Sequence, residues 1–155
     1  MHKAYYSSVL PQSVGEVWNM IRDFNNYPRY IEGVTESVIE DNKRGDEVGA
    51  VRRFLYGDMW IRQRLTAHSD ADRSITYAGL EPFPYPGAQG ANAPAPVDYQ
   101  GTIRLTPIVD GDRTLIEWFV EFEAKQRDSA QWIGLLEPMI QQWVDSLRRT
   151  LAGER

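Results

Sequence analysis

The segment 48–56 carries one charged side chain on an otherwise apolar strand face. Arg52 shares its alternation phase with four apolar residues, Val48, Ala50, Phe54 and Tyr56. Residues of one phase point to the same side of a sheet, so this guanidinium is predicted to point inward. An inward charge among apolar neighbours is costly unless it is paired.

Two kinds of partner are predicted for Arg52, and both apply if a ligand displaces an internal pair. The first is a ligand carboxylate, enolate or phenolate, because the planar donor fork of a guanidinium suits such oxyanions. The second is an internal salt bridge to one of three acidic residues, Glu36, Glu81 or Asp98. In the first case Arg52 is the electrostatic anchor of a binding site.

Polar side chains also interrupt the inward faces of later strands. Gln63 shares its phase with Met59, Ile61, Leu65 and Ala67. Gln63, Tyr77 and Tyr99 each either orient the polar end of a ligand or are core residues with satisfied hydrogen bonds. A mostly apolar wall with a few polar groups is typical of a small-molecule pocket. The predicted ligand-binding residues are Arg52, Phe54, Tyr56, Gln63, Tyr77, Tyr99, Trp118, Phe122, Trp132, Met139 and Trp143.

The sequence has few residues that could form a metal site or a reactive thiol. It has no cysteine, which excludes disulfides, thiolate metal sites and cysteine nucleophiles. His2 lies in the N-terminal segment and His68 at the end of a strand. Both are expected to be surface histidines rather than metal ligands, because metal ligation needs three or four convergent ligands. We therefore expect no metal and no cofactor, and no catalytic residue is assigned.

Charge and hydropathy limit the partners. A net charge of −5 argues against a general nucleic-acid binder, which would carry a basic stripe. The outward row Trp60, Arg62 and Arg64 is better explained by a homodimer contact or a solvated face than by a nucleic-acid platform. No segment approaches the roughly 20 apolar residues of a membrane span, and the N-terminus has no uninterrupted apolar stretch. These features predict a soluble, cytoplasmic protein.

Two C-terminal segments are expected to enclose the site. In 113–124, Trp118 and Phe122 lie on the apolar side of an alternating strand. From about 129 to 151, apolar residues recur at three- and four-residue steps, which predicts an amphipathic helix that covers this strand face. For Trp118 and the helix residues Trp132 and Trp143, ordinary core packing competes with a place in the cavity wall.

The ends of this helix have recognisable signals. Asp128 or Ser129 is expected to cap its N-terminus, and Gly153 to stop it. Pro138 is expected either to kink the helix or to mark where its main part begins. Arg148 and Arg149 suit its negative end.

The remaining elements complete a single domain, 1–155. Ser13 and Glu16 form a capping box that predicts a first helix, followed by one further turn at 28–31. Strands are predicted at 3–10, 34–41, 48–56, 59–69, 73–80, 98–109 and 113–124. This order predicts an α+β fold: a curved seven-stranded antiparallel sheet that grips a long C-terminal helix, with two short helices between strands 1 and 2. The proline- and glycine-rich segment 82–96 is either a binding loop or lid, or a spacer.

Several short motifs follow one another along the chain. They are Val17-Trp18 with Asp23-Phe24, Val48-Gly49-Ala50-Val51-Arg52, Arg64-Leu65, Tyr99-x-Gly101, and Asp110-Gly111 followed by Glu117-Trp118. In order and spacing they resemble the polyketide cyclase/dehydrase and lipid-transport branch of the START-like (SRPBCC) superfamily, the helix-grip fold of the birch pollen allergen. The resemblance covers nearly the whole chain and is specific for fold, not for function.

This resemblance implies that a small hydrophobic or aromatic molecule, with or without an anionic group, binds between the sheet and the long helix. One alternative is an aromatase/cyclase or dehydratase-type enzyme, in which Arg52 stabilises an enolate and Tyr77 or Tyr99 moves protons. Another is a protein-interaction module. Related sequences often carry a glutamate where this chain has Gln63, and an amide cannot act as a carboxylate base.

Overall fold

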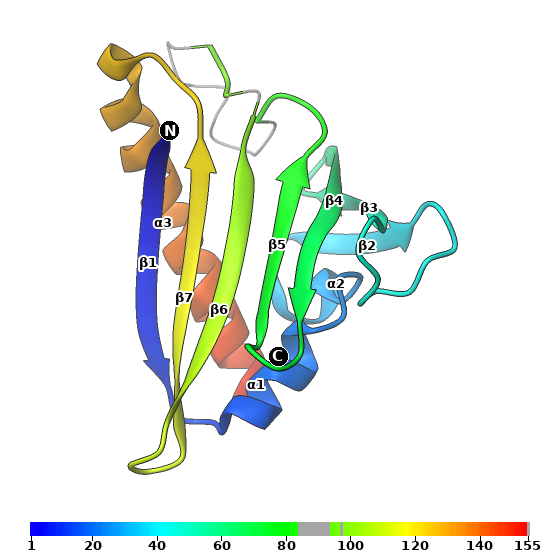
Figure 1. Cartoon of the computed structure of the whole chain (residues 1–155), viewed down its shortest axis with the longest axis vertical. Coiled ribbons are helices and arrows are strands. Elements are labelled where there is room, and N and C mark those ends of the chain that lie inside the picture. Colours follow the sequence, from blue (N-terminus) through cyan, green and yellow to red (C-terminus); the bar gives the residue numbers. More distant parts are fainter. Residues whose placement is uncertain (84–93, 97, 155) are drawn as a thin grey trace.

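The computed structural model describes residues 1–83, 94–96 and 98–154. Its strands form one antiparallel seven-stranded sheet in the order β1-β7-β6-β5-β4-β3-β2, and α3 lies along one face of the sheet (Figure 1). The predicted helix-grip arrangement is therefore confirmed. In chain order the elements are β1 (His2–Leu10), α1 (Val14–Ile21), α2 (Tyr27–Tyr30), β2 (Val34–Ile39), β3 (Val51–Tyr56), β4 (Met59–Ser69), β5 (Ser74–Gly79), β6 (Gln100–Ile108), β7 (Arg113–Phe122) and α3 (Gln126–Leu151).

The first helix begins where its capping signal predicts. The backbone N–H of Glu16 donates to Oγ of Ser13 at 3.3 Å, which satisfies one of the unpaired amides of the first turn. Val17, Trp18 and Ile21 are buried, so α1 presents one apolar side to the core. Its end places Phe24 and α2 beside the sheet face that faces α3.

The long helix differs from expectation at its start. It begins at Gln126, with Lys125 as N-cap and no side-chain capping bond, so the prediction that Asp128 or Ser129 caps it is wrong. Asp128 lies in the first turn, where its charge still favours the positive helix end. The helix runs through Pro138 and ends at Leu151, and Gly153 follows with a φ of +77°.

A bulge in β4 reverses the predicted facing of its last residues. The pairing with β5 shifts between Leu65 and Ala67, so that Ala67 pairs with Thr76 and His68 with Ile75. A one-residue shift moves every later side chain to the other face of a strand. Ala67 is consequently exposed and the side chain of His68 is only 7% exposed, so both sequence predictions for these residues are wrong.

The third strand starts later than its alternation suggests. Gly49 has a φ of +98° and its N–H donates to the carbonyl of Leu65 at 2.8 Å, so the extended chain begins only at Val51. Val48 lies before this turn and is 54% exposed, which corrects its predicted place on the inner wall. Ala50, after the turn, is buried as expected.

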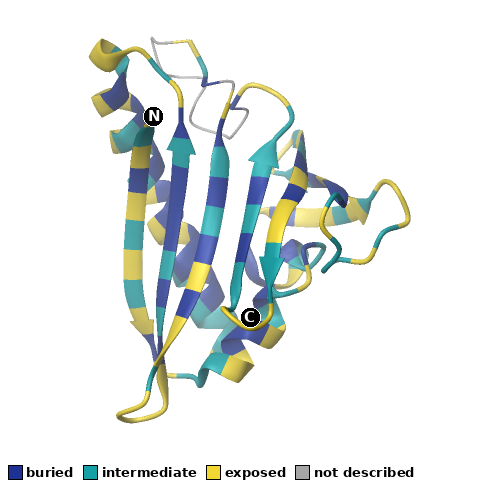
Figure 2. Cartoon of the chain, viewed as in Figure 1, coloured by how far each residue is buried: buried dark blue, intermediate teal, exposed yellow. Residues whose placement is uncertain are grey.

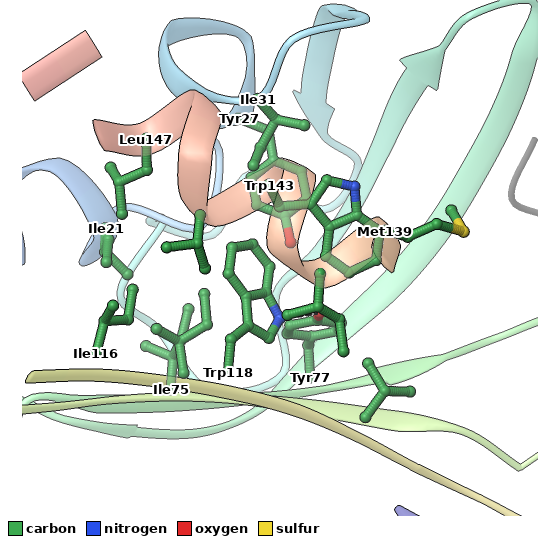
Figure 3. Packing of buried hydrophobic residues seen from close by; sticks show 14 of the residues in the cluster. Ile21, Tyr27, Ile31, Ile75, Tyr77, Ile116, Trp118, Met139, Trp143 and Leu147 are labelled. Atoms are coloured by element: carbon green, nitrogen blue, oxygen red, sulfur yellow. Dashed lines mark hydrogen bonds between the residues drawn. The ribbon is translucent and has the colours of Figure 1, made fainter. Parts of the chain in front are cut away.

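Burial alternates along the central strands, as the bands of Figure 2 show. The inward residues of the sheet form one hydrophobic core with the apolar side of α3 and with α1 and α2. Trp118, Tyr77 and Trp143 lie at the centre of this packing (Figure 3). On the outer face, Trp60 is 42% exposed and Arg53 stacks on its ring at 4.7 Å.

Candidate functional site

Arg52 is buried in the core, as its position in the strand predicts. The residue is 1% exposed. Its Nε and one terminal nitrogen donate to Oε1 of Gln63 at 3.1 and 2.6 Å, and the other terminal nitrogen donates to the carbonyl of Phe24 at 2.9 Å. Gln63 is Arg52's direct cross-strand partner, and it is completely buried.

Aromatic rings supply the rest of the environment of this charge. The guanidinium carbon lies 3.8 Å from the ring centroid of Phe24 and 3.7 Å from that of Tyr27, with Phe54 and Tyr77 each at 5.1 Å. Rings at these distances attract a cation through their quadrupole, most strongly where water is excluded. We call these four rings the aromatic cage of Arg52.

The predicted internal salt bridge is not present among the described residues. Glu36, Glu81 and Asp98 are all exposed, and the ion pairs of the described residues do not include Arg52. The alternation of β2 explains Glu36, because Ser37 pairs with the inward Phe54 and the preceding residue therefore faces outward. Amide and carbonyl oxygens thus replace the expected carboxylate.

Two glycines make room for the tyrosines of the site. A Cβ on Gly101 would lie 2.2 Å from Cζ of Tyr77, and one on Gly79 would lie 2.0 Å from Cζ of Tyr99. The two rings therefore lie flat against the backbone of neighbouring strands. Gly79 pairs with Gln63 across the β4–β5 ladder. The hydroxyl end of the Tyr99 ring therefore lies over the residue directly opposite Gln63.

Tyr77 connects the cage to the centre of the core. Its hydroxyl accepts a hydrogen bond from Nε1 of Trp118 at 3.1 Å. Burial raises the pKa of the Tyr77 hydroxyl well above its usual value, and the nearby Tyr27 raises it further. The phenol is therefore neutral at physiological pH and can donate a hydrogen bond, but it is a poor general base.

A surface pocket opens between α3, the end of β3 and the connection that follows α2. Its volume is about 290 Å³, and Tyr56 and Trp143 are its aromatic lining residues. Nε1 of Trp143 donates to the hydroxyl of Tyr56 at 2.9 Å. Charged and polar residues form the outer rim: Glu32, Gln142, Asp145 and Arg149.

Behind this pocket an apolar crevice leads toward the cage. Tyr56 and Trp143 line the crevice as well as the pocket. The crevice alone is also lined by Tyr27, Phe54, Ile31 and Val34. Its volume is about 10 Å³, so a ligand can enter only if these side chains move. The crevice ends against two of the four rings that surround Arg52.

The other predicted site residues lie deeper or farther along the core. Phe122 and Trp132 are fully buried, and Met139 is 9% exposed. Tyr99 and Trp132 are joined by Phe83, whose ring centroid is 5.2 Å from Tyr99 and 6.1 Å from Trp132. The role of all these side chains as ligand contacts stays a prediction. Residues 84–93 of the predicted loop 82–96 lie outside the described residues.

Sequence reasoning missed three aromatic residues that the fold brings to the site. Phe24 and Tyr27 lie where α1 ends and α2 begins, a break in the helical pattern that carries no sign of contact with a distant strand. Phe83 lies in a proline-rich connection. A buried arginine calls for ring partners, but nothing local identifies which rings supply them.

A second polar cluster lies at the end of α1, away from the cage. Asp70 accepts hydrogen bonds from Nε1 of Trp18 at 2.9 Å and from Nε of Arg22 at 3.2 Å, and Nε2 of His68 lies 3.3 Å from the same carboxylate. The hydrogen bonds from Arg22 and Trp18 lower the pKa of Asp70 from 3.8 to about 2. This cluster fastens α1 to the bulged end of β4.

The geometry of sheet and helix agrees with the comparisons to known proteins. A family model described as polyketide cyclase / dehydrase and lipid transport matches residues 1–152. The chain belongs to this family. Among curated proteins, none matches it in sequence.

Solved structures share the fold at low sequence identity. A protein of Nitrosospira multiformis is 24% identical with a TM-score of 0.77, over 99% of both chains. A START superfamily protein from Mycobacterium smegmatis is 12% identical with a TM-score of 0.72, over 100% of both chains. The di-domain ARO/CYC BexL from the BE-7585A biosynthetic pathway is 13% identical with a TM-score of 0.75, over 98% of this chain and 47% of BexL.

Within the described residues, no helix of this family member is long and apolar enough to cross a membrane.

Proposed function

We propose that the protein binds a small hydrophobic or aromatic molecule in the interior between the sheet and α3, and that Arg52 attracts an anionic group on that molecule. The observation that carries the proposal is a fully buried guanidinium whose oxygen partners are an amide and a backbone carbonyl. Neither partner carries a negative charge, so the site holds a net positive charge inside an apolar core. A ligand oxyanion is the group that would gain most from it.

The route to this charge supports the same proposal. The pocket beside Tyr56 and Trp143 is open to solvent, and the crevice behind it is lined by apolar and aromatic side chains. A flat aromatic molecule would fit between such rings once they separate, because stacked and edge-on ring contacts are favourable. Its charged end would then meet Arg52 next to Tyr27 and Phe54.

Binding is favoured over catalysis by the residue opposite Arg52. Gln63 occupies the cross-strand position from which a carboxylate would act as a base, and an amide does not take up protons at physiological pH. Tyr77 is held neutral by burial. Both groups can orient a ligand by hydrogen bonding, which requires no change of protonation.

The decisive experiment compares two arginines on one strand. Arg52→Leu is expected to weaken binding of 1-naphthoate by about 2–5 kcal/mol, the usual range for removing one member of a buried charged pair. Arg53→Leu is the matched control, because Arg53 is exposed on the opposite face of β3. Titration calorimetry of both variants and the wild type measures the affinities, and unaltered naphthoate affinity in Arg52→Leu refutes the proposal.

A molecule that co-purifies with the protein can identify the natural ligand without any added probe compound. Native mass spectrometry of protein purified without denaturation is expected to show an added mass that disappears on denaturation. The same measurement on Arg52→Leu is expected to show less of this mass if the ligand is anionic. Fragmentation of the released molecule then gives its chemical class.

A further inference from the structure

We infer that Phe83 is an intrachain stand-in for part of the ligand, and that displacing its ring opens a subsite for an aromatic group whose uncharged hydrogen-bond acceptor binds Nε1 of Trp132. This inference rests on the proposed function, because it adds a second contact point in the same interior space. It concerns the end of the core next to Tyr99, not the end at Arg52.

Phe83 belongs to a connection but reaches the core. It lies between the end of β5 at Gly79 and the start of β6 at Gln100, and it is 3% exposed. Its ring packs edge-on against Tyr99 on the sheet side and against Trp132 of α3. The ring therefore fills space between the sheet and the helix, where the proposed ligand would lie.

The backbone around Phe83 allows it to leave without loss of the sheet. Its N–H donates to the carbonyl of Pro96 at 2.8 Å, a bond between the two arms of the connection rather than between two strands. Two bonds at the strand end do not involve Phe83: Gly79 N–H donates to the Tyr99 carbonyl at 3.0 Å, and Leu80 N–H donates to the Arg62 carbonyl at 3.2 Å. Segments outside the strand ladder open at lower free energy than the strands themselves.

Trp132, which packs against Phe83, is the reason to expect that a phenyl ring is an imperfect occupant of this place. The indole is completely buried, yet its Nε1–H finds no hydrogen-bond acceptor among the described residues. A buried donor without a partner is unfavourable, and the phenyl ring of Phe83 offers no lone pair to satisfy it. An occupant with a ring and a neighbouring acceptor would fill the space and also accept the hydrogen bond of Nε1–H.

These contacts define the class of chemical group that the subsite takes. The acceptor is expected to be uncharged, as in an aryl ketone, because an anion gains more at the guanidinium of Arg52. Gln63 separates the two ends, since it pairs with Arg52 on one side and with Gly79, under the ring of Tyr99, on the other. A polycyclic molecule could therefore contact both ends at once.

The first test removes the internal occupant and measures a single-ring probe. Phe83→Ala is expected to bind acetophenone roughly tenfold more tightly than the wild type, because the probe no longer competes with the phenyl ring. Phe83→Leu, which leaves a smaller gap, serves if the alanine variant does not fold. Equal acetophenone affinity in the wild type and the variant overturns the inference.

The second test isolates the hydrogen bond. α-Methylstyrene has nearly the shape of acetophenone but carries a methylene group in place of the carbonyl oxygen. In Phe83→Ala, acetophenone is expected to bind roughly tenfold more tightly than α-methylstyrene, because only the ketone satisfies the indole donor. In ¹⁵N-labelled protein the Trp132 indole N–H resonance, assigned with Trp132→Phe, is expected to move downfield with acetophenone alone. The same response to both probes overturns the inference.

Two further measurements keep the result specific. Leu147→Ala creates a gap in the same core, and this variant is expected to show no preference for the ketone over the alkene. Binding of 1-naphthoate and its dependence on Arg52 are measured in the same proteins. If naphthoate binding persists while the acetophenone tests fail, the subsite is rejected and the proposed function stands.

Discussion

Oε1 of Gln63 accepts two hydrogen bonds from the guanidinium of Arg52, at 2.6 and 3.1 Å, inside a fully buried cross-strand pair. The amide holds the cation in one orientation without neutralising it. A carboxylate at the same position would instead cancel the charge internally.

Replacing Gln63 separates its structural role from its electrostatic one. Gln63→Leu is expected to lower the free energy of unfolding by about 2–3 kcal/mol, because it leaves two donors of a buried charge without acceptors. Gln63→Glu is expected to be less destabilising but to weaken 1-naphthoate binding roughly tenfold or more, because the new carboxylate pairs with Arg52 and repels the ligand. Denaturant unfolding and calorimetry measure the two effects, and tighter naphthoate binding to the glutamate variant contradicts this account.

Gly101 is expected to be intolerant of any side chain. A Cβ there would lie 2.2 Å from Cζ of Tyr77, so Gly101→Ala must push the ring off the sheet. We expect a loss of about 1–3 kcal/mol in the free energy of unfolding, as in overpacked cores. Gly134→Ala, in α3 with nothing within 4 Å of its Cβ position, is the control and should stabilise by about 0.5–1 kcal/mol. Similar effects of the two substitutions would disprove the packing argument.

Asp70 gives the stability of the fold an acid-dependent component. Because its folded-state pKa is about 2 and its ordinary value 3.8, its contribution is fully present above pH 3.8 and is lost as pH falls through about 2. Asp70→Asn removes the titrating carboxylate, so the variant should lose less stability than the wild type over this acid range. Thermal melts across that range measure the difference, and NMR titration of the Asp70 carboxyl reports its pKa directly.

The Tyr56 hydroxyl is expected to act as a latch on the crevice. Tyr56→Phe removes the acceptor that Nε1 of Trp143 contacts at 2.9 Å, so the two side chains that separate pocket and crevice should part more readily. We expect 1-naphthoate to associate and dissociate faster, with little change in Kd, in stopped-flow measurements. Tyr5→Phe on the outer face of β1 is the control, since Tyr5 bonds Glu117 there. Unchanged rates in Tyr56→Phe would place the entrance elsewhere.

Much of the fold is readable from local patterns. Alternation of apolar residues locates all seven strands, and the three- and four-residue spacing of Trp132, Met139 and Trp143 locates the long helix. Arg52 is assigned to the interior for the same reason, and it is buried. These signals are local, because the period of a strand or helix is a property of the backbone itself.

Register and partners are decided by contacts between distant segments. The bulge after Leu65 turns His68 inward and Ala67 outward, and no residue type in the chain marks it. The identity of the acceptor for Arg52 depends on which strand residue lies opposite, and its aromatic cage depends on where α1 ends. Such choices reflect the summed packing of the whole core.

Taken alone, the sequence determined the order of elements, the family and the presence of an inward arginine among apolar residues. Only the tertiary structure decided that this charge is held by Gln63 and the carbonyl of Phe24 rather than by an acid. The physical reason is that burial and alternation are encoded residue by residue along one strand. Stabilisation of a buried charge instead depends on oxygens and rings that segments far apart in the chain bring within a few ångströms.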